Sequence, residues 1–333
     1  MSKLIDGPPE HGDHVLIALA LKWRGEWWAS SLLIVNAVSD GGPDLIGVIG
    51  GTGLGDALGV LGEGERHELD TPFGRPSGPI QIVDVAGVRV ALLARHGEGH
   101  MLNPSRVPYR ANIFALKQLG VTHILASGAV GSLREEIAPR DLVLPDQAID
   151  RTFRRAGTFF EDIAVHVELA SPFCGALRAA LGRCAPAGGV RLHDRGTYVC
   201  MEGPQLSTRA ESDLYRGWGG DLIGMTLMPE AKLAREAEIC YAAVALVTDY
   251  DCWRPHKAQV SQLRLLEEII SNMKSAAESA LALIRNTIPA IVVESVPSCT
   301  CQSALELAIW SDRDKIDAPT RERLAPLLGR VLA

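Results

Sequence analysis

Short apolar runs alternate with helical patterns along most of this chain, and that alternation restricts the fold more than any other feature. The runs over residues 121–126 and 242–247 are too apolar for a sheet edge that faces water, so they predict buried strands. Residues 80–85 and 88–93 flank Ala86-Gly87 and predict a hairpin. We therefore expect an α/β fold in a single domain, with a mixed, twisted β-sheet surrounded by helices.

The helices are predicted from their ends and from their periodicity. Gly120 predicts the end of a helix over residues 112–119. Thr208 and Glu211 fit a capping box that opens a helix to about residue 218, and Pro229 suits the first turn of another that reaches about residue 239. A long amphipathic stretch covers residues 258–284. It predicts one apolar face in the core or beneath a functional site, made of Leu266, Ile269, Ile270 and Met273.

The chain has 333 residues with 47% hydrophobic content, which is enough to bury a full core. We expect an N-terminal extension over residues 1–43, a central domain over residues 44–289 and a helical C-terminal extension over residues 290–333. Within the last segment, residues 304–309 and 320–331 have helical patterns.

Charge and hydropathy exclude several classes of partner. The 40 acidic and 33 basic residues give a net charge of -7, so we expect no nucleic-acid partner. No apolar run reaches the roughly 18 residues that a membrane span needs. Residues 1–14 lack the basic start of a secretory signal, so the sequence predicts a cytoplasmic protein without a membrane partner.

The seven cysteines are scattered over the chain, unlike those of a disulfide-dense secreted scaffold. Cys299 and Cys301 are separated by a single residue and have no second ligand pair at the usual spacing for zinc. We therefore expect no metal site.

A predicted strand runs into the glycine-rich turn Gly50-Gly51-Thr52-Gly53, whose backbone amides can approach a phosphate. If Gly51 and Gly53 are the first two glycines of a dinucleotide-binding fingerprint, the third position is Asp56. The spacing thus disfavours a nicotinamide or flavin enzyme. A turn without a ligand would account for the glycines but not for Thr52.

Arg95 and His96 follow the strand predicted over residues 88–93. Ligands of α/β proteins sit at the carboxyl ends of strands, and arginine offers a planar fork for phosphate oxygens. Taken alone, such a pair is more often structural or solvated. The presence of Thr52 and Thr226 at comparable positions favours one shared oxyanion pocket.

Asp249 and Asp251 follow the apolar run over residues 242–247. Residues two apart in an extended chain point the same way, so both carboxylates are expected to reach one edge of a ligand. A purine offers a ring nitrogen and, in adenine, an exocyclic amine, which carboxyl groups match as donor when protonated and as acceptor. A metal site would need further ligands. Helix capping or a surface loop is an equally good explanation of these two residues alone.

Together these residues resemble a known family, the trimeric purine nucleoside phosphorylases, over about residues 45–290. The motifs occur in the family's order. They are Gly47-Val-Ile-Gly-Gly-Thr-Gly53, Leu93-Ala-Arg-His-Gly97, Gly131-Ser-Leu-Arg-Glu-Glu136, Glu202-Gly-Pro-Gln205, Ser207-Thr-Arg-Ala-Glu-Ser212, Gly224-Met-Thr226, Pro229-Glu-Ala231 and Thr248-Asp-Tyr-Asp-Cys-Trp253. The resemblance implies the fold of the purine and uridine phosphorylases.

The resemblance also implies a phosphate site. Thr52, Arg95, His96 and Thr226 match its side chains, and Ala129 matches a backbone contact. Inorganic phosphate would be the co-substrate, with no other cofactor.

The nucleoside contacts follow in the same way. Met225 matches the neighbour of the ribose, and Glu202 lies in the loop beside the sugar and the base. Asp249 is similar to the residue that protonates or hydrogen-bonds the departing purine at N7, and Asp251 to the one that reads the 6-amino group. His166 matches a residue that reaches the 5' pocket of the neighbouring subunit, which implies a homotrimer.

The activity implied is phosphorolysis of 5'-methylthioadenosine to adenine and 5-methylthioribose 1-phosphate, a pentosyl transfer of purine and methionine salvage. Members that act on 6-oxopurines carry an asparagine near the position of Asp251, so adenine is the expected base. A 6-oxopurine nucleoside or methylthioinosine phosphorylase is the alternative, and a nucleoside-binding protein without turnover is a further one. Val260 or Leu263 would line an apolar 5' pocket.

Two positions depart from the family pattern. Leu206 stands where the family usually has an aromatic residue stacked on the base, so it is expected to pack on the ring face without stacking. Gly128 stands where the family often has a threonine near phosphate, which leaves backbone amides for that contact. The Cys299-Thr-Cys301 segment is similar to the tails of some thermophilic members, in which disulfides form.

Overall fold

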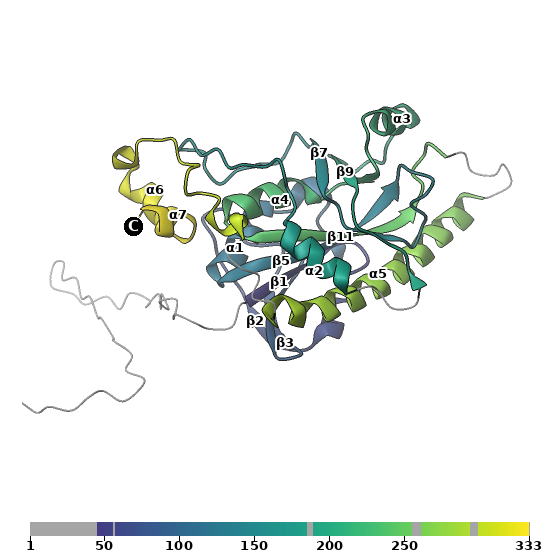
Figure 1. Cartoon of the computed structure of the whole chain (residues 1–333), viewed down its shortest axis with the longest axis horizontal. Coiled ribbons are helices and arrows are strands. Elements are labelled where there is room, and N and C mark those ends of the chain that lie inside the picture. The colour runs from purple at the N-terminus through teal and green to yellow at the C-terminus, as the bar shows by residue number, and fades with distance from the viewer. Residues whose placement is uncertain (1–44, 56, 185–188, 255–260, 294–298, 333) are drawn as a thin grey trace, which may run out of the picture. The chain divides into compact units, whose positions relative to one another are not determined.

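The computed structural model describes residues 45–55, 57–184, 189–254, 261–293 and 299–332 (Figure 1). The extension expected over residues 1–43 and the expected pocket residue Val260 lie outside the described residues. The described strands form one mixed sheet of 11 strands, and helices cover it (Figure 1). The α/β architecture expected from the sequence is confirmed.

The central strand is β5 (Val121–Ser132), and three neighbouring strands pair with different parts of its length. β1 (Leu45–Gly50) runs parallel to its first half, as far as Ala126. β11 (Cys240–Asp249) runs parallel on the opposite side, as far as Gly131. β10 (Leu222–Gly224) pairs antiparallel with the end of β5, on the side that β1 has left. The middle of β5 therefore has an open side between the ends of β1 and β10.

Beyond β1 the sheet continues through a hairpin, as predicted. β4 (Val88–Ala94) is parallel to β1 and antiparallel to β3 (Ile80–Val85), which pairs with β2 (Glu65–His67). The hairpin turn has Ala86 at φ 54° and Gly87 at φ 83°, the left-handed pair that matches the twist of a two-residue hairpin.

On the other side, β10 is parallel to β9 (Thr197–Met201), and β9 is parallel to β7 (Gln147–Arg151). The short strands β6 (Leu142–Val143) and β8 (Leu192–His193) extend the sheet from β11.

Seven α-helices lie within the described residues. They are α1 (Tyr109–Gln118), α2 (Gly175–Arg183), α3 (Arg209–Gly217), α4 (Leu227–Glu236), α5 (Gln262–Val293), α6 (Ala318–Arg323) and α7 (Ala325–Leu332). Gly120 follows α1 at φ 86°, Thr208 and Glu211 form the predicted capping box of α3, and Pro229 lies in the first turn of α4.

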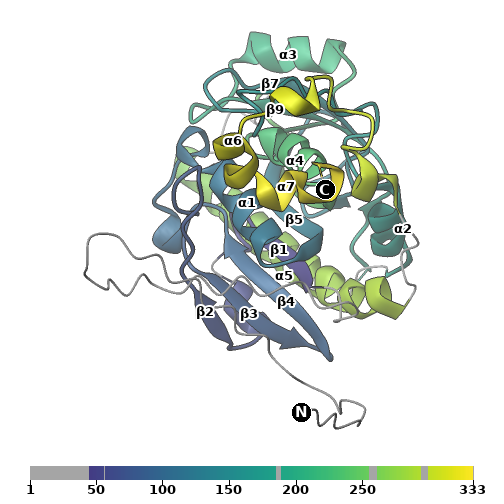
Figure 2. The same cartoon turned by 90° about the vertical axis from the view of Figure 1, so that its left-hand side faces the viewer.

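Two apolar layers cover opposite faces of the sheet, because alternate side chains of a strand point to opposite faces. In β1, Leu45 and Ile49 pack in the layer that contains α1, α4 and α7. Ile46 and Val48 pack in the other layer, with α2 and α5. Figure 2 shows α6 and α7 lying side by side next to α1. Burial on both faces explains why the central strands are continuously apolar.

The face predicted for the long helix is only partly correct. Ile269 and Met273 are half-buried, but Leu266 is 54% and Ile270 50% exposed. The buried stripe lies further along α5 and includes Ala280, Leu283, Ile284 and Ile288. The first turns of α5 therefore contribute little to the core, and the helix is anchored by its second half.

The C-terminal segment departs from the sequence prediction in two ways. The helix expected over residues 304–309 is absent, since Ile309 pairs with Val165 and the Trp310 amide donates to the carbonyl of Ala164 at 3.0 Å. The boundary expected at residue 290 falls inside α5, and Leu305 and Leu328 pack in the same core as β1. α6 and α7 occupy the second helical stretch that was predicted.

Candidate active site

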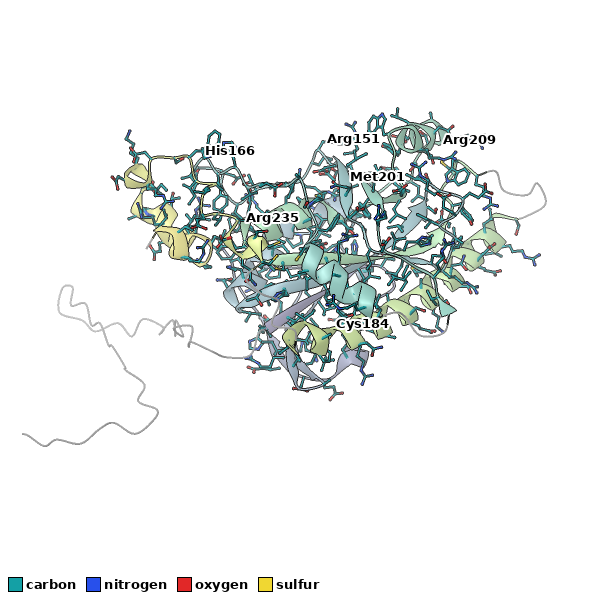
Figure 3. The ribbon with its side chains drawn as sticks, viewed as in Figure 1. Arg151, His166, Cys184, Met201, Arg209 and Arg235 are labelled. Atoms are coloured by element: carbon teal, nitrogen blue, oxygen red, sulfur yellow. The ribbon has the colours of Figure 1, made fainter. Side chains whose placement is uncertain are left out.

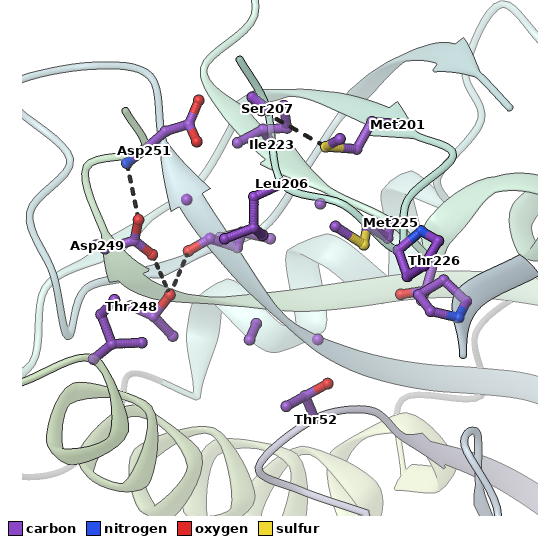
Figure 4. Close-up of a pocket in the computed structure, with 18 of the residues that line it drawn as sticks. Thr52, Met201, Leu206, Ser207, Ile223, Met225, Thr226, Thr248, Asp249 and Asp251 are labelled. Atoms are coloured by element: carbon purple, nitrogen blue, oxygen red, sulfur yellow. Dashed lines mark hydrogen bonds between the residues drawn. The ribbon is translucent and has the colours of Figure 1, made fainter. Parts of the chain in front are cut away.

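A cavity of about 370 Å³ lies where four strands end. β1 and β4 deliver Thr52 and His96, β10 delivers Met225 and Thr226, and β11 ends at Asp249. The open side of β5 forms its floor with residues 128–131. The described lining contains eight of the residues predicted from the sequence, namely Thr52, His96, Ala129, Leu206, Met225, Thr226, Asp249 and Asp251 (Figure 4).

The glycine turn after β1 presents Thr52 to this cavity. The amides of Leu54 and Gly55 donate to the carbonyl of Gly51 at 3.1 and 2.7 Å, so the chain closes on itself directly after the strand. A side chain at Gly51 is impossible, because a Cβ there would lie 2.3 Å from Nη1 of Arg95 and 2.5 Å from the Ser127 carbonyl. The 3-10 helix η1 (Leu58–Leu61) follows in place of the α-helix of a dinucleotide-binding fold.

His96 lies in the cavity wall as a neutral imidazole. Its Nδ1 lies 2.7 Å from the Leu102 carbonyl, which can only accept, so Nδ1 carries the proton and Nε2 is the free acceptor. Burial and, to a lesser extent, the neighbouring charge of Arg95 together lower the pKa of His96 to about 4, although the hydrogen bond to Leu102 opposes the change. His100 stacks on its ring with 4.2 Å between centroids. In this tautomer, Nε2 of the neutral imidazole accepts a hydrogen bond from an O–H group of an oxyanion that keeps a proton.

Arg95 was predicted to contact phosphate, but the structure places it beneath the cavity wall and not in the lining. Its Nε and Nη2 donate to Glu230 at 2.8 and 2.7 Å, and Nη1 donates to the Ser127 carbonyl at 2.6 Å. Tyr241 donates to the same Glu230 carboxylate at 2.7 Å. Burial alone would lower the pKa of Arg95, but the Glu230 carboxylate outweighs it and the pKa is raised. The contacts therefore make Arg95 a positioning residue for the glycine turn.

The two aspartates lie on the opposite side of the cavity from Thr226 in Figure 4. Asp249 accepts from the Thr248 hydroxyl at 2.6 Å and from the Asp251 amide at 3.0 Å. Asp251 accepts from the Ser212 hydroxyl at 2.5 Å. The extended geometry expected for the pair is wrong, because β11 ends at Asp249 and Asp251 has a φ of 43°. Both still line the cavity, since the turn is held by Asp249 itself.

The middle of the cavity is apolar. Met225 packs against Gly203, where a Cβ would lie 2.5 Å from the methionine sulfur. Leu206 lines the cavity but is 80% exposed, so it stands at the mouth and covers a ligand only in part. Ile223 and Ile269 add further apolar surface from β10 and α5.

Glu202 does not line the cavity, contrary to the expectation of a sugar and base contact. Its carboxylate accepts from the Ser105 hydroxyl at 2.5 Å, the Phe153 amide at 2.8 Å and Nε of Arg155 at 3.1 Å. Burial raises the pKa of Glu202, but these hydrogen bonds and the Arg154 amide outweigh it and lower the pKa to about 2. Glu202 thus fixes the loops that carry the cavity residues.

His166 and Leu263 also lie away from the cavity lining. The ring of His166, which Figure 3 labels, packs edge-on against Trp310 with 4.7 Å between centroids. Leu263 is 67% exposed, and Ile269, six residues later on α5, takes the lining position instead. The role of His166 in a neighbouring subunit stays a prediction.

The sequence reasoning missed two kinds of residue. His100 and Ser207 line the cavity next to predicted residues and were within reach of the motif analysis. Sequence motifs could not indicate Arg155, because its guanidinium donates to the carbonyls of Met225 and Met228, which are 70 and 73 residues away, at 2.5 and 2.8 Å. No local pattern marks such a contact.

Within the part of the chain that the structure describes, no helix is long and apolar enough to span a membrane.

Comparison with known proteins supports the resemblance. Residues 45–289 match the model of the phosphorylase superfamily. An S-methyl-5'-thioadenosine phosphorylase of Synechocystis sp. is 50% identical over 290 residues, which cover 86% of this chain and 87% of that protein. Its counterpart from Hyperthermus butylicus is 48% identical, over 79% of this chain and 95% of that protein.

Solved structures give the same result. The crystal structure of a methylthioadenosine phosphorylase from an antarctic soil metagenomic library has a TM-score of 0.77 at 46% identity, covering 86% of this chain and 99% of that one. The methylthioadenosine phosphorylase of Schistosoma mansoni in complex with adenine has a TM-score of 0.72 at 32% identity, covering 81% and 100%. The chain therefore belongs to the phosphorylase superfamily, within its S-methyl-5'-thioadenosine phosphorylase family.

Proposed function

We propose that this protein is a pentosyltransferase that uses inorganic phosphate to convert 5'-methylthioadenosine into adenine and 5-methylthioribose 1-phosphate. One observation carries the proposal. A single cavity brings Thr52, His96 and Thr226 to one part of its wall and Asp249 and Asp251 to another, with apolar side chains between them. Relatives about 50% identical are named for this substrate.

The oxyanion side of the cavity suits phosphate. Thr52 and Thr226 offer hydroxyl donors, the backbone of residues 128 and 129 borders the same space, and Nε2 of His96 accepts from a protonated phosphate oxygen. Gly128 offers no side chain to this wall, but its backbone borders the cavity. Arg95 supports the wall from beneath through the Ser127 carbonyl. We assign phosphate binding to Thr52, His96, Ala129 and Thr226, with Arg95 as their support.

The reaction breaks the bond from C1' to N9 and forms one from C1' to a phosphate oxygen. Asp249, when protonated, donates to N7 and so neutralises the charge of the departing base. Positive charge develops on the ribose as the base leaves, and bound phosphate stabilises it from the opposite face. Electrons and protons balance without a redox partner, so we propose phosphate as the only co-substrate.

Adenine is the base that Asp251 selects. Its carboxylate accepts one hydrogen bond from Ser212 and keeps acceptor capacity for a 6-amino group. A 6-oxo group would place an acceptor against an acceptor, which costs about 1–3 kcal/mol for an unpaired buried polar group. A 6-oxopurine specificity would need a donor at this position.

We further propose a cytoplasmic homotrimer in which His166 completes the 5' pocket of a neighbouring subunit. Residues 45–289 form the phosphorylase part, and the segment from residue 299 onwards packs on the same core. Light scattering coupled to size exclusion tests the assembly, and a fully active monomer would contradict the role of His166.

The substrate is tested by base release from 5'-methylthioadenosine, 5'-methylthioinosine, adenosine and inosine, each with and without phosphate. We expect phosphate-dependent release of adenine, fastest from 5'-methylthioadenosine. Preference for the two inosine compounds would move the assignment to 6-oxopurines. Binding without release from any of them would show a nucleoside-binding protein.

A further inference from the structure

Four cysteines that are distant in sequence meet in space. Cys174 precedes α2, Cys240 is the first residue of β11, and Cys299 and Cys301 lie at the 3-10 helix η5 (Thr300–Ser303). All four sulfur atoms lie within 4.8 Å of one another, and the sulfurs of Cys174 and Cys299 are 3.7 Å apart. Each of them is a free cysteine. No second ligand pair stands at the usual sequence spacing from Cys299 and Cys301, but the fold brings Cys174 and Cys240 to them from far away in the chain.

The separations fit a tetrahedral metal site. A zinc–sulfur bond of about 2.3 Å places the sulfurs of a regular tetrahedron about 3.8 Å apart. A disulfide needs about 2.05 Å between its sulfurs, far less than the 3.7 Å that separates Cys174 and Cys299. Three of the four residues are buried and Cys299 is half-buried, so water has little access.

One buried cation acts on the cluster, since the positive charge of Arg235 interacts with Cys301. Arg235 is itself buried and held by the Ser171 carbonyl at 2.7 Å. A four-thiolate zinc complex carries two negative charges, which a fixed cation nearby partly offsets.

We propose that Cys174, Cys240, Cys299 and Cys301 bind a structural zinc ion. Binding replaces the thiol protons, so four thiols and Zn²⁺ give a tetrathiolate complex and release up to four protons. All four positions are filled by the protein, which leaves no place for a substrate and marks a structural site. Cys240 begins β11 and Asp249 ends it, so the ion lies at the far end of that strand from the cavity. Its role is to fasten the segment after α5 to β11 and α2.

The test is the metal content of the full chain, purified without chelators and measured by inductively coupled plasma mass spectrometry. We expect one zinc ion per chain in the natural protein and in the control Cys184→Ser, whose sulfur lies outside the cluster and donates to the Asn286 carbonyl. Cys301→Ser should lose the ion. If that variant does not fold, cobalt substitution of the natural protein still decides, since four thiolates around cobalt give intense thiolate charge-transfer bands and tetrahedral ligand-field bands.

Two further readouts separate the alternatives. A chelator should lower the thermal unfolding midpoint of the natural protein and leave that of Cys301→Ser unchanged. Thiol counts on denatured, unreduced protein should give all seven cysteines once zinc is released. A count of three thiols, with no metal, would mean two disulfides in the cluster and would overturn the proposal. Seven thiols with no bound metal would also overturn it. So would iron bound in place of zinc.

Discussion

Arg95 and Glu230 form a fully buried ion pair beneath the glycine turn, with 2.7 Å between Nη2 and Oε2. The two residues come from the end of β4 and from α4, and the pair holds the Ser127 carbonyl against the turn that carries Thr52. The side of the cavity that carries Thr52 therefore rests on an ion pair whose two residues lie outside the described lining.

Glu230→Gln should destabilise the protein strongly, because it leaves the Arg95 charge buried without its partner. Breaking a buried pair in this way costs about 3–5 kcal/mol, which urea unfolding measures directly. Arg75→Ala is the control, since Arg75 and its partner Asp70 are 74% and 78% exposed, and the expected loss is about 0–1 kcal/mol. Equal losses in the two variants would contradict the structural role of the buried pair.

Asp251→Asn should change which base the enzyme prefers. The amide donates to a 6-oxo group, so the ratio of kcat/KM for 5'-methylthioadenosine over 5'-methylthioinosine should fall by about 5- to 150-fold, equivalent to 1–3 kcal/mol. Asp249→Asn is the matched control, because it should slow both substrates alike by removing the proton donor. An unchanged ratio in Asp251→Asn would show that another residue reads the base.

The stability of the protein should carry a contribution from neutral His96. Its pKa is about 4 in the folded protein and about 6.5 when unfolded, so the unfolded chain binds more protons between these values. Stability therefore falls as the pH drops from 6.5 towards 4. Unfolding free energies of the natural protein and His96→Gln, compared across this range, should converge as the pH falls. A constant difference between them would argue against a neutral buried imidazole.

Leu206→Phe should tighten nucleoside binding. Leu206 stands at the mouth of the cavity and is 80% exposed, so a larger ring there has room and can stack on the base. An added aromatic stack contributes about 0.5–1.5 kcal/mol, which lowers KM by roughly 2- to 12-fold. Leu206→Ala should raise KM instead. If both variants leave KM unchanged, the side chain at this position does not cover the base.

The sequence predicted where side chains emerge from the sheet better than what those side chains contact. Thr52, His96 and Asp249 follow apolar strands, and parallel strands bring their carboxyl ends to one edge, so their meeting could be foreseen. Arg95 emerges at the same edge, but its partner Glu230 lies 135 residues away, and nothing local separates an arginine that faces a ligand from one that faces a carboxylate.

The same limit applies to the other departures. The motif around Glu202 predicts a position beside the ligand, whereas its partners Ser105 and Arg155 come from 97 and 47 residues away. The cysteine cluster depends on Cys174 meeting Cys299 across 125 residues. Helical periodicity showed an apolar face on α5, but only the tertiary packing decides which turns of that face lie over the sheet.

The most direct test of the account is the fate of phosphate during turnover of 5'-methylthioadenosine, followed by phosphorus NMR alongside adenine release. We predict that each adenine formed consumes one phosphate ion and produces one sugar 1-phosphate, and that release stops when phosphate is omitted. Adenine release that continues without phosphate, with no phosphate ester formed, would contradict phosphorolysis and show that water is the nucleophile.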